Sequence, residues 1–183
     1  FALSGEKIDI YISNNSQKPG DYQFYSSVLT DSHGKIKYEL TTEKRLPLGI
    51  YQVKMVVRCD HTYVEFYIGV LPANTETVVF SIDGSFAANI SFSGTDPKVR
   101  AGAVDVVRHW QDLGYLIIYI TARPDMQHYK VTNWLAQHNF PIGMVFFSDG
   151  LKRDPIKQKA ETLKNLVTNC SLSLQAGYGS AKD

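Results

Sequence analysis

The sequence predicts an α/β fold, a Rossmann-type parallel sheet with flanking helices in residues 75–183, preceded by an antiparallel, immunoglobulin-like β-sandwich in residues 1–74. Three observations predict it. The chain has 183 residues, which is enough for two small domains. Before residue 75, short alternating stretches are separated by turn signals, with no convincing helix. After residue 75, apolar strand-like stretches alternate with helical periodicity, as in a parallel sheet covered by helices.

In the first domain, alternation of apolar residues predicts short strands. Ile8, Ile10 and Ile12 share one face of the first of them. Turn signals follow at residues 31–34 and at residues 46–49, where proline and glycine interrupt the pattern. The expected strands cover residues 7–13, 22–29, 36–40, 51–57 and 63–68. Short strands at this spacing favour an antiparallel sandwich.

In the second domain, strands are expected at residues 77–82, 115–120, 144–147 and 171–176, and helices at residues 97–113, 124–139 and 154–169. The strand at residues 115–120 is apolar on both faces, as a central parallel strand is. Two helices are expected to begin at Asp96-Pro97 and Asp154-Pro155, because aspartate is a favoured N-cap and proline suits the first helical position. Gly114 is expected to end the first helix.

Composition excludes several classes of function. The formal net charge is +1, so no global field favours nucleic acid as a partner. Cys59 and Cys170 lie far apart and outside any CxxC pair, which predicts two buried thiols in a reducing compartment and neither a disulfide framework nor a zinc site. No apolar run approaches the ~18–20 residues of a membrane span, and the first residues do not resemble a signal peptide. A cytosolic segment of a longer protein is expected.

Polar residues and glycines gather where the predicted parallel strands end. They are Ser81, Asp83, Gly84 and Ser85; Thr121, Ala122 and Arg123; Ser148, Asp149 and Gly150; and Gly177, Gly179 and Ser180 followed by Lys182 and Asp183. The third helix adds Lys157, Lys159 and Lys164. Taken singly, each group also fits a turn, a helix cap, loop glycines or a solvated helix face. Because ligands of such sheets bind at the carboxyl ends of the strands, the groups are expected to converge on one site.

The chemistry of that site favours a phosphate. A turn containing glycine exposes backbone N–H groups to an anion. Thr121 offers a hydroxyl donor, and a lysine offers a point charge for phosphoryl oxygens. Acidic residues at the rim suit Mg²⁺, which prefers oxygen ligands.

The order of these groups resembles the motif order of the haloacid-dehalogenase (HAD) phosphatases. More closely, Ser81–Ser85 (SIDGS), SGTDP ending at Pro97, VRAGAVDVVRHW ending at Trp110 and YITARP ending at Pro124 resemble the lipin/Ned/Smp homology domain of the membrane-associated phosphatidylinositol transfer proteins, the Nir/RdgB family. DGLKRDP ending at Pro155 and AGYGS ending at Ser180 fit the same resemblance. It covers residues 75–183 strongly and residues 1–74 through weaker motifs. It implies that the remaining HAD strands lie beyond Asp183.

One departure from the family pattern governs the expected function. The resemblance implies an aspartate nucleophile at position 81, where this chain has Ser81, and a general acid/base at Asp83. Asp83 is poorly matched to activate a serine hydroxyl, so a catalytically inactive pseudo-phosphatase is expected. The implied Mg²⁺ ligands are Asp83 and Asp183, in a site weakened or lost with the aspartate. We therefore expect that the domain requires no cofactor, and Mg²⁺ is the one cofactor whose binding stays an open alternative.

The phosphate-binding half of the motif set survives. The resemblance implies that Ser81, Asp83, Gly84, Ser85, Thr121, Ala122, Arg123 and Lys159 bind the phosphate, with Lys157 as the alternative if the register of the helix differs. An aspartate at position 81 would repel an anion about 4 Å away by roughly 4 kcal/mol, a repulsion that serine removes. The implied ligand is phosphatidic acid.

A lipid ligand requires a site that opens at a membrane surface. Residues 86–92 follow the phosphate loop and present Phe86, Ile90 and Phe92, either to lipid or, as a flap strand, to the core. Arg123, Lys152 and Arg153 are candidates for headgroup contact. The resemblance implies a peripheral domain that recruits its parent lipid-transport protein to the plasma membrane or to endoplasmic-reticulum contact sites. Alternatives are an active Mg²⁺-dependent phosphatidate phosphatase, a non-lipid scaffold and a phosphoprotein-binding module.

Overall fold

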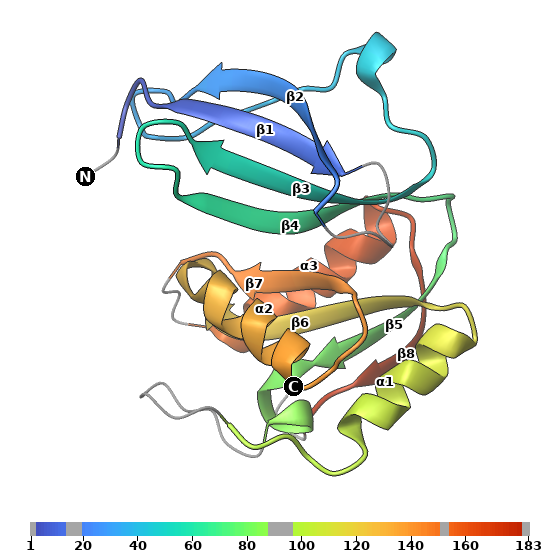
Figure 1. The fold of residues 1–183 in the computed structure, drawn as a ribbon. Helices are drawn as coiled ribbons and strands as arrows, with labels where there is room; N and C mark the ends of the chain where they lie inside the picture. Colours follow the sequence, from blue (N-terminus) through green and yellow to red (C-terminus); the bar gives the residue numbers. More distant parts are fainter. Residues whose placement is uncertain (1–2, 14–19, 88–96, 151–153, 181–183) are drawn as a thin grey trace. The chain divides into compact units, whose positions relative to one another are not determined.

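The chain divides into two compact units, Phe1–Pro72 and Ala73–Asp183. The structure, a computed structural model, describes residues 3–13, 20–87, 97–150 and 154–180. Figure 1 draws the first unit from blue to green and the second from green to red. The division falls within two residues of the boundary that the change in sequence pattern places between residues 74 and 75.

The first unit is built on one antiparallel sheet. Its elements are β1 (Lys7–Ser13), β2 (Tyr22–Leu29), η1 (Thr42–Lys44), β3 (Gly49–Val57) and β4 (Tyr63–Val70), and the strand order is β2-β1-β3-β4. Alternation places Ile10, Ile12 and Val53 on one face of this sheet, where they are buried. The predicted antiparallel architecture is therefore confirmed.

The segment at residues 36–40, predicted as a strand, is not one. Its Tyr38 packs against the buried cluster, and Leu46 joins it from the same connection. Tyr38 also contacts Tyr25 edge to face, with ring centroids 6.4 Å apart. Within the described residues, the connection between β2 and β3 thus covers the core face of the sheet with side chains, and its alternating pattern reflects this packing rather than strand pairing.

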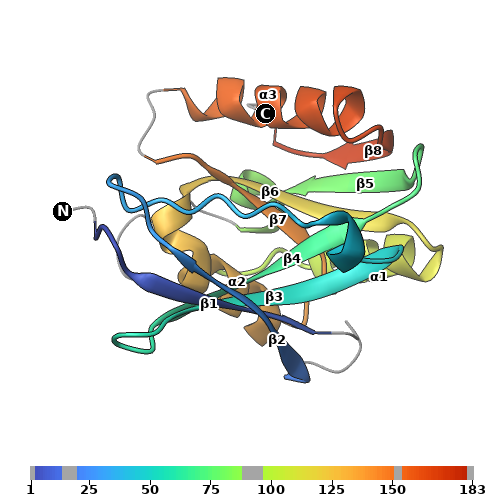
Figure 2. The ribbon, with the colours of Figure 1, turned by 90° about the horizontal axis from the view of Figure 1, so that it is seen from above.

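The second unit is the predicted α/β fold. Its elements are β5 (Glu76–Ser81), the π-helical turn η2 (Ile82–Phe86), α1 (Ala103–Asp112), β6 (Leu116–Pro124), η3 (Asp125–Gln127), α2 (His128–Gln137), β7 (Met144–Ser148), α3 (Pro155–Thr168) and β8 (Ser173–Tyr178). The strands run parallel in the order β7-β6-β5-β8. Helices α1 and α2 lie on one face and α3 on the other (Figure 2). The order reverses at β5, which makes the end of that strand the switch point where such sheets bind ligands.

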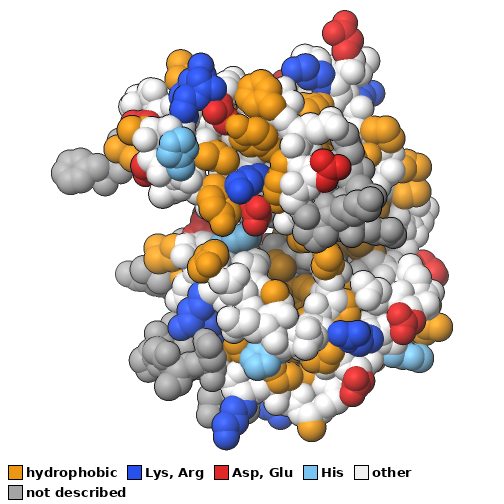
Figure 3. Space-filling view, in the orientation of Figure 1, with side chains coloured by type: hydrophobic (Ala, Val, Ile, Leu, Met, Phe, Trp, Pro, Cys, Tyr) orange, Lys and Arg blue, Asp and Glu red, His pale blue; other side chains and the backbone are white. Residues whose placement is uncertain are grey.

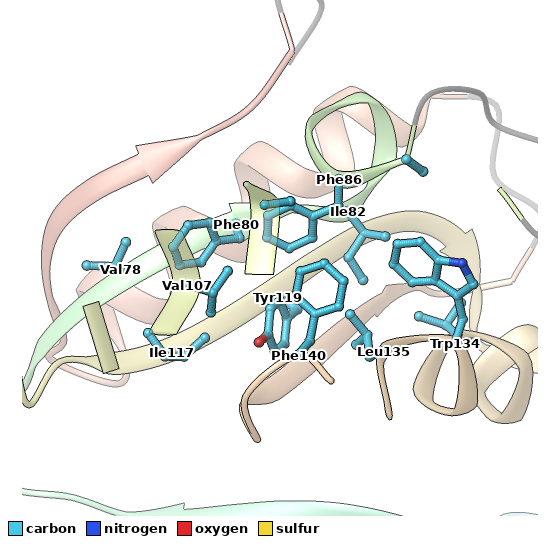
Figure 4. Packing of buried hydrophobic residues seen from close by; sticks show 13 residues of the cluster. Val78, Phe80, Ile82, Phe86, Val107, Ile117, Tyr119, Trp134, Leu135 and Phe140 are labelled. Carbon is cyan, nitrogen blue, oxygen red and sulfur yellow. The ribbon is translucent and has the colours of Figure 1, made fainter. Parts of the chain in front are cut away.

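The larger core lies between this sheet and helices α1 and α2. Phe80 and Tyr119 project from neighbouring strands, and Val107, Trp134 and Phe140 close over them (Figure 4). The opposite sides of the same strands carry Val79, Ser81 and Ile120 toward α3. Strand alternation therefore fixes which polar side chains share a compartment with α3.

Two further expectations need correction. The first helix begins at Ala103 rather than at residue 97, because Gly102 adopts a left-handed φ of 76° and Arg100 donates its backbone N–H to Phe86. Asp96, its predicted N-cap, lies outside the described residues. Cys59 and Cys170 are exposed rather than buried.

Two further sequence features can be compared with the structure. Asp154 caps α3 as predicted, accepting the backbone N–H of Lys157 at 3.0 Å. In the part of the chain that the structure describes, every helix is too short or too polar to cross a membrane.

Candidate functional site

Three chain segments bring the predicted site residues to one end of the parallel sheet. Ser81 is the last residue of β5, and Asp83 lies in the π-helical turn that follows. Residues 121–123 lie beyond the regular pairing of β6 with β7, where the register shifts between Ile120 and Pro124. Lys159 reaches in from the second turn of α3. Figure 1 shows the ends of β5, β6 and β7 and the starts of α2 and α3 on the same side of this unit.

The carboxylate of Asp83 is the centre of the cluster. Thr121 donates its hydroxyl to both carboxylate oxygens, at 3.2 and 3.0 Å, and Ala122 donates its backbone N–H. The Nε of Arg123 lies 3.8 Å from Oδ1 of this carboxylate, and the Nζ of Lys159 lies 3.6 Å from Oδ2. These are donors that the sequence assigns to a phosphate, and in this structure they are directed at an anion of the protein itself.

Ser81 joins the cluster through Lys159. The Nζ of Lys159 donates to the Ser81 hydroxyl oxygen at 2.9 Å, and that hydroxyl donates to the backbone oxygen of Asp83 at 3.3 Å. Lys157, the alternative, is exposed and lies outside this cluster. The structure therefore brings Lys159, and not Lys157, to Ser81 and Asp83.

The charges of this cluster are buried. Exposed fractions of the side chains are 4% for Asp83, 6% for Arg123 and 9% for Lys159. Moving an ion out of water costs several kcal/mol even after relaxation, so such a group is retained only with close partners. Counted by themselves, these three groups carry a formal charge of +1, which an anion beside them would balance.

A cavity of about 560 Å³ opens from Ser81 and Lys159 along β8 and α3. Val79, Ile120, Leu163 and Leu174 supply apolar wall, and Gly177 and Ser180 lie along the β8 side. This volume falls within the range of small-molecule sites, which combine apolar walls with a few polar groups. It exceeds the needs of inorganic phosphate alone.

Not every predicted phosphate donor of the glycine-containing turn lies beside Lys159. Gly84 lies in the π-helical turn, as expected of a loop at a strand end. Ser85 lines a separate cavity of about 240 Å³ beside Phe86, Arg100 and Gly102. Its buried hydroxyl oxygen has no hydrogen-bond partner among the described residues. The structure therefore does not bring the Ser85 side chain to the Ser81–Lys159 end of the site.

The residues that the structure describes do not present a Mg²⁺ donor set. No group of three or more His, Cys, Asp or Glu side chains suitable for a metal occurs among them. Asp83, one of the two predicted ligands, has two cations within 4 Å of its carboxylate, and these oppose a divalent cation. Asp183, the other, lies outside the described residues. The weakened or lost Mg²⁺ site stays a prediction.

Phe86 does not face lipid in this structure. Its side chain is 3% exposed and packs against Phe80, Tyr119 and Phe140, with ring centroids 5.4, 6.0 and 4.7 Å away (Figure 4). The alternative of a segment packed on the core fits Phe86, and its prediction as a membrane contact is wrong. Ile90, Phe92, Lys152 and Arg153 lie outside the described residues.

Two features of the site were not predicted from the sequence. One is the pairing of Ser148 with Gln158, a hydrogen bond between the end of β7 and α3. The other is the use of Asp83 as an internal anion. No sequence signal reports the second, because motif order identifies residues that converge but not which of them satisfy one another.

Charges elsewhere are mixed. On the face drawn in Figure 3, Lys and Arg side chains are interspersed with Asp and Glu and form no large patch of one sign. Attraction of an anion therefore depends on the local cluster, as the net charge of +1 predicts.

Comparison with known proteins connects both units to one family. Residues 78–183 match the family model of the LNS2 domain of PITM 1–3, and residues 1–70 match the model of the β-sandwich domain of PITM 1–3. The chain is 57% identical to human membrane-associated phosphatidylinositol transfer protein 2 over 182 residues, 99% of this chain and 13% of that protein. Identity is 56% both to human membrane-associated phosphatidylinositol transfer protein 3, covering 100% and 19%, and to Drosophila protein retinal degeneration B, covering 100% and 14%.

The chain therefore spans less than a fifth of the length of these relatives. Because both of its units match models of the same proteins, and in the same order, the chain belongs to the family of the membrane-associated phosphatidylinositol transfer proteins PITM 1–3, of which it carries the β-sandwich and LNS2 domains.

Proposed function

We propose that this chain is a catalytically inactive, phosphatase-like module that binds phosphatidic acid and thereby recruits a longer phosphatidylinositol transfer protein to membranes. The observation that supports it best is the buried cluster at the end of β5, in which Arg123 and Lys159 both lie beside Asp83 and Lys159 also contacts Ser81. A phosphomonoester supplies the additional negative charge and the acceptor oxygens that such donors bind.

The environment of Ser81 argues against phosphoryl transfer. A serine nucleophile requires a base that accepts its proton. The Ser81 hydroxyl instead donates to a backbone carbonyl and accepts a hydrogen bond from Lys159. A donor cannot serve as the base, so binding without hydrolysis is the expected outcome.

The apolar cavity favours a lipid over free phosphate. It begins at Ser81 and Lys159, so a ligand whose phosphate contacts these groups extends along Leu163 and Leu174. A phosphate esterified to glycerol provides such a body. The names of the relatives describe membrane-associated proteins, which is consistent with a peripheral module at the plasma membrane or at contact sites of the endoplasmic reticulum.

A scaffold without a ligand is the main rival, and burial argues against it. Replacing a buried charged cluster by apolar residues of similar volume is often neutral or stabilising. A domain with a purely structural role has no need of two cations with exposed fractions below 10% at a strand end. A phosphoprotein ligand would need the same donors, and the vesicle-binding experiment below distinguishes it from a lipid ligand.

The test is co-sedimentation of the 183-residue chain with vesicles of equal net charge, containing either phosphatidic acid or phosphatidylserine. Phosphate release is followed in the same tubes with Mg²⁺. We expect selective binding to phosphatidic acid and no release. Release of phosphate would return the domain to the active phosphatases, and equal binding to both vesicle sets would reduce the site to general electrostatics.

Lys159→Met sharpens the test, because methionine keeps the length of the side chain and removes its charge. Loss of a charge-assisted contact is expected to lower the affinity for phosphatidic acid vesicles at least about tenfold. Lys164→Ala, an exposed lysine farther along α3, is the matched control and is expected to bind as the wild type does. Ser81→Asp is expected to weaken binding in the absence of metal, and unchanged binding would mean that residue 81 does not face the phosphate.

A further inference from the structure

Two large apolar side chains project into solvent directly after the β6 segment of the site. Met126 is 72% exposed and Tyr129 is 73% exposed, the largest fractions among the exposed large hydrophobic side chains that the structure describes. Exposed apolar side chains of this size, grouped beside a candidate site, are typical of an interaction surface. Because Met126 and Tyr129 are mostly exposed, packing in the core of this unit does not explain why both positions are apolar.

Met126 and Tyr129 are three residues apart in consecutive helical segments, η3 and the start of α2. This spacing places them on the same side of the helical turn. Met126 follows the buried Arg123, the cation that lies beside Asp83, by three residues. Asp125 stabilises the turn by accepting the backbone N–H of Met126 at 2.9 Å.

The first turn of α3 also carries an exposed apolar side chain. Ile156 is 48% exposed and precedes the buried Lys159 by three residues, which is about one helical turn. Lys157 beside it is exposed. Exposed apolar side chains thus lie three residues from each cation of the site along the chain, after Arg123 of β6 and before Lys159 of α3.

The chemistry of this rim suits an anionic bilayer more than a protein groove. Apolar and aromatic side chains enter the boundary between headgroups and acyl chains, and nearby basic side chains contact anionic headgroups. The exposed Lys157 and the partly exposed Lys130 supply such charges at the two helix starts. Both helix starts lie on the side of the unit where β5 and β6 end (Figure 1). The apolar rim and Ser81 of the proposed phosphate site therefore lie at the same end of the sheet.

We propose that Met126, Tyr129 and Ile156 form a membrane-contacting rim that enters the surface of an anionic bilayer and holds the mouth of the site at headgroup level. This inference rests on the proposed function, since the phosphate of a bilayer lipid is what the rim brings within reach of Lys159. It assigns membrane contact to residues that follow Arg123 and precede Lys159, in place of the buried Phe86.

The experiment compares matched exposed positions at the two ends of the sheet. Met126→Ser with Tyr129→Ser is the rim variant. Leu113→Ser, which removes a 58% exposed leucine after α1 at the opposite end, is the control. Binding to phosphatidic acid vesicles and binding of soluble glycerol 3-phosphate, followed by NMR, are measured for each. The rim variant is expected to lose roughly tenfold or more in vesicle affinity, since membrane burial of two apolar side chains is removed, and to keep glycerol 3-phosphate binding.

A second measurement locates the rim directly. Met126→Trp and Leu113→Trp each add a tryptophan to the same background of Trp110 and Trp134. Brominated lipids are expected to quench the added fluorescence of the first variant and not of the second. Both substitutions replace exposed side chains, so the fold is expected to be preserved.

The outcomes separate the rim from the phosphate site. Equal vesicle affinities of rim and control variants, or equal quenching of the two tryptophans, overturn the rim. Loss of glycerol 3-phosphate binding together with vesicle binding in the rim variant also overturns it, because the residues would then act on the phosphate site. If the wild type binds phosphatidic acid and phosphatidylserine vesicles alike and the rim variant weakens both, the rim is supported and the proposed lipid selectivity fails.

Discussion

Each unit of the chain holds a carboxylate between a hydroxyl and a guanidinium, and burial of the cations distinguishes the two clusters. In the first unit, Arg58 donates to Asp9 through two nitrogens, at 2.8 and 2.7 Å, and Ser27 donates its hydroxyl. In the second, Asp83 accepts from Thr121 and lies beside two cations. The Arg58 side chain is 49% exposed, whereas those of Arg123 and Lys159 are less than 10% exposed.

The difference separates a structural ion pair from a candidate binding site. Asp9 and Arg58 satisfy each other one to one, and although the Asp9 side chain is only 11% exposed, its cationic partner is 49% exposed, so water and salt screen the pair. In the second cluster, two buried cations lie beside one buried carboxylate, so these charges interact strongly. Residue identity alone does not distinguish the two clusters, whereas the burial of the cations and the number of cations beside each carboxylate do.

Removal of the carboxylate in the second unit is expected to have the largest effect. Asp83→Asn leaves Arg123 and Lys159 buried without their anion, which is expected to lower the free energy of unfolding by about 3–5 kcal/mol. Urea denaturation followed by tryptophan fluorescence measures it, because both tryptophans lie in the second unit. A loss below about 1 kcal/mol would show that the cluster is not electrostatically coupled.

Adding inorganic phosphate to the Asp83→Asn variant tests the same cluster further. An anion that binds the native state stabilises it in proportion to its occupancy. Added inorganic phosphate is expected to recover part of the stability lost by Asp83→Asn, since it replaces the missing negative charge. Asp9→Asn in the first unit is the control, for which no phosphate-specific recovery is expected. Equal recovery of both variants would assign the effect to general salt stabilisation.

Sequence patterns predict what local physics and strand alternation determine. The parallel sheet, the Asp154 cap and the convergence of Ser81, Asp83, Thr121 and Lys159 all follow from periodicity, cap chemistry and motif order. The segment at residues 36–40 is mispredicted because alternation also serves side-chain packing in a connection without strand pairing. The start of the first helix is displaced by the left-handed Gly102, a backbone choice that an Asp-Pro signal upstream obscures.

Exposure was the least predictable property. Phe86 and Met126 are both large apolar residues close to site motifs, yet one is 3% and the other 72% exposed. The core contacts of Phe86 with Phe80 and Phe140 come from segments distant in sequence, so no local pattern reports them. For the same reason, sequence identified the members of the Asp83 cluster but not that the carboxylate uses the donors assigned to phosphate.

Acid titration is expected to affect the first unit moderately. Hydrogen bonds from Arg58 and Ser27 lower the pKa of Asp9 below its ordinary value of about 3.9. A carboxyl group with a lowered pKa in the folded state contributes stability that is complete above its unfolded pKa and is lost as the pH falls through the folded pKa. The hydrogen-exchange protection factors of the β1 and β2 amides, which correct for the intrinsic exchange rate at each pH, are therefore expected to fall below about pH 4 in the wild type. Asp9→Asn should remove most of this dependence, and an unchanged profile would mean that another group dominates.

The smallest effect is expected for Lys54, a partly exposed counterpart of the buried Lys159. Its Nζ lies 4.0 Å from the ring centroid of Tyr63 and 3.9 Å from Oε1 of Glu65. Cation–π contacts at exposed sites contribute about 0.5–1 kcal/mol, so Lys54→Met is expected to cost no more than this in hydrogen exchange of β3 and β4. It should leave binding to phosphatidic acid vesicles unchanged, whereas Lys159→Met abolishes most of it. Equal losses of binding would mean that lysine charge, and not burial beside Ser81 and Asp83, governs membrane recognition.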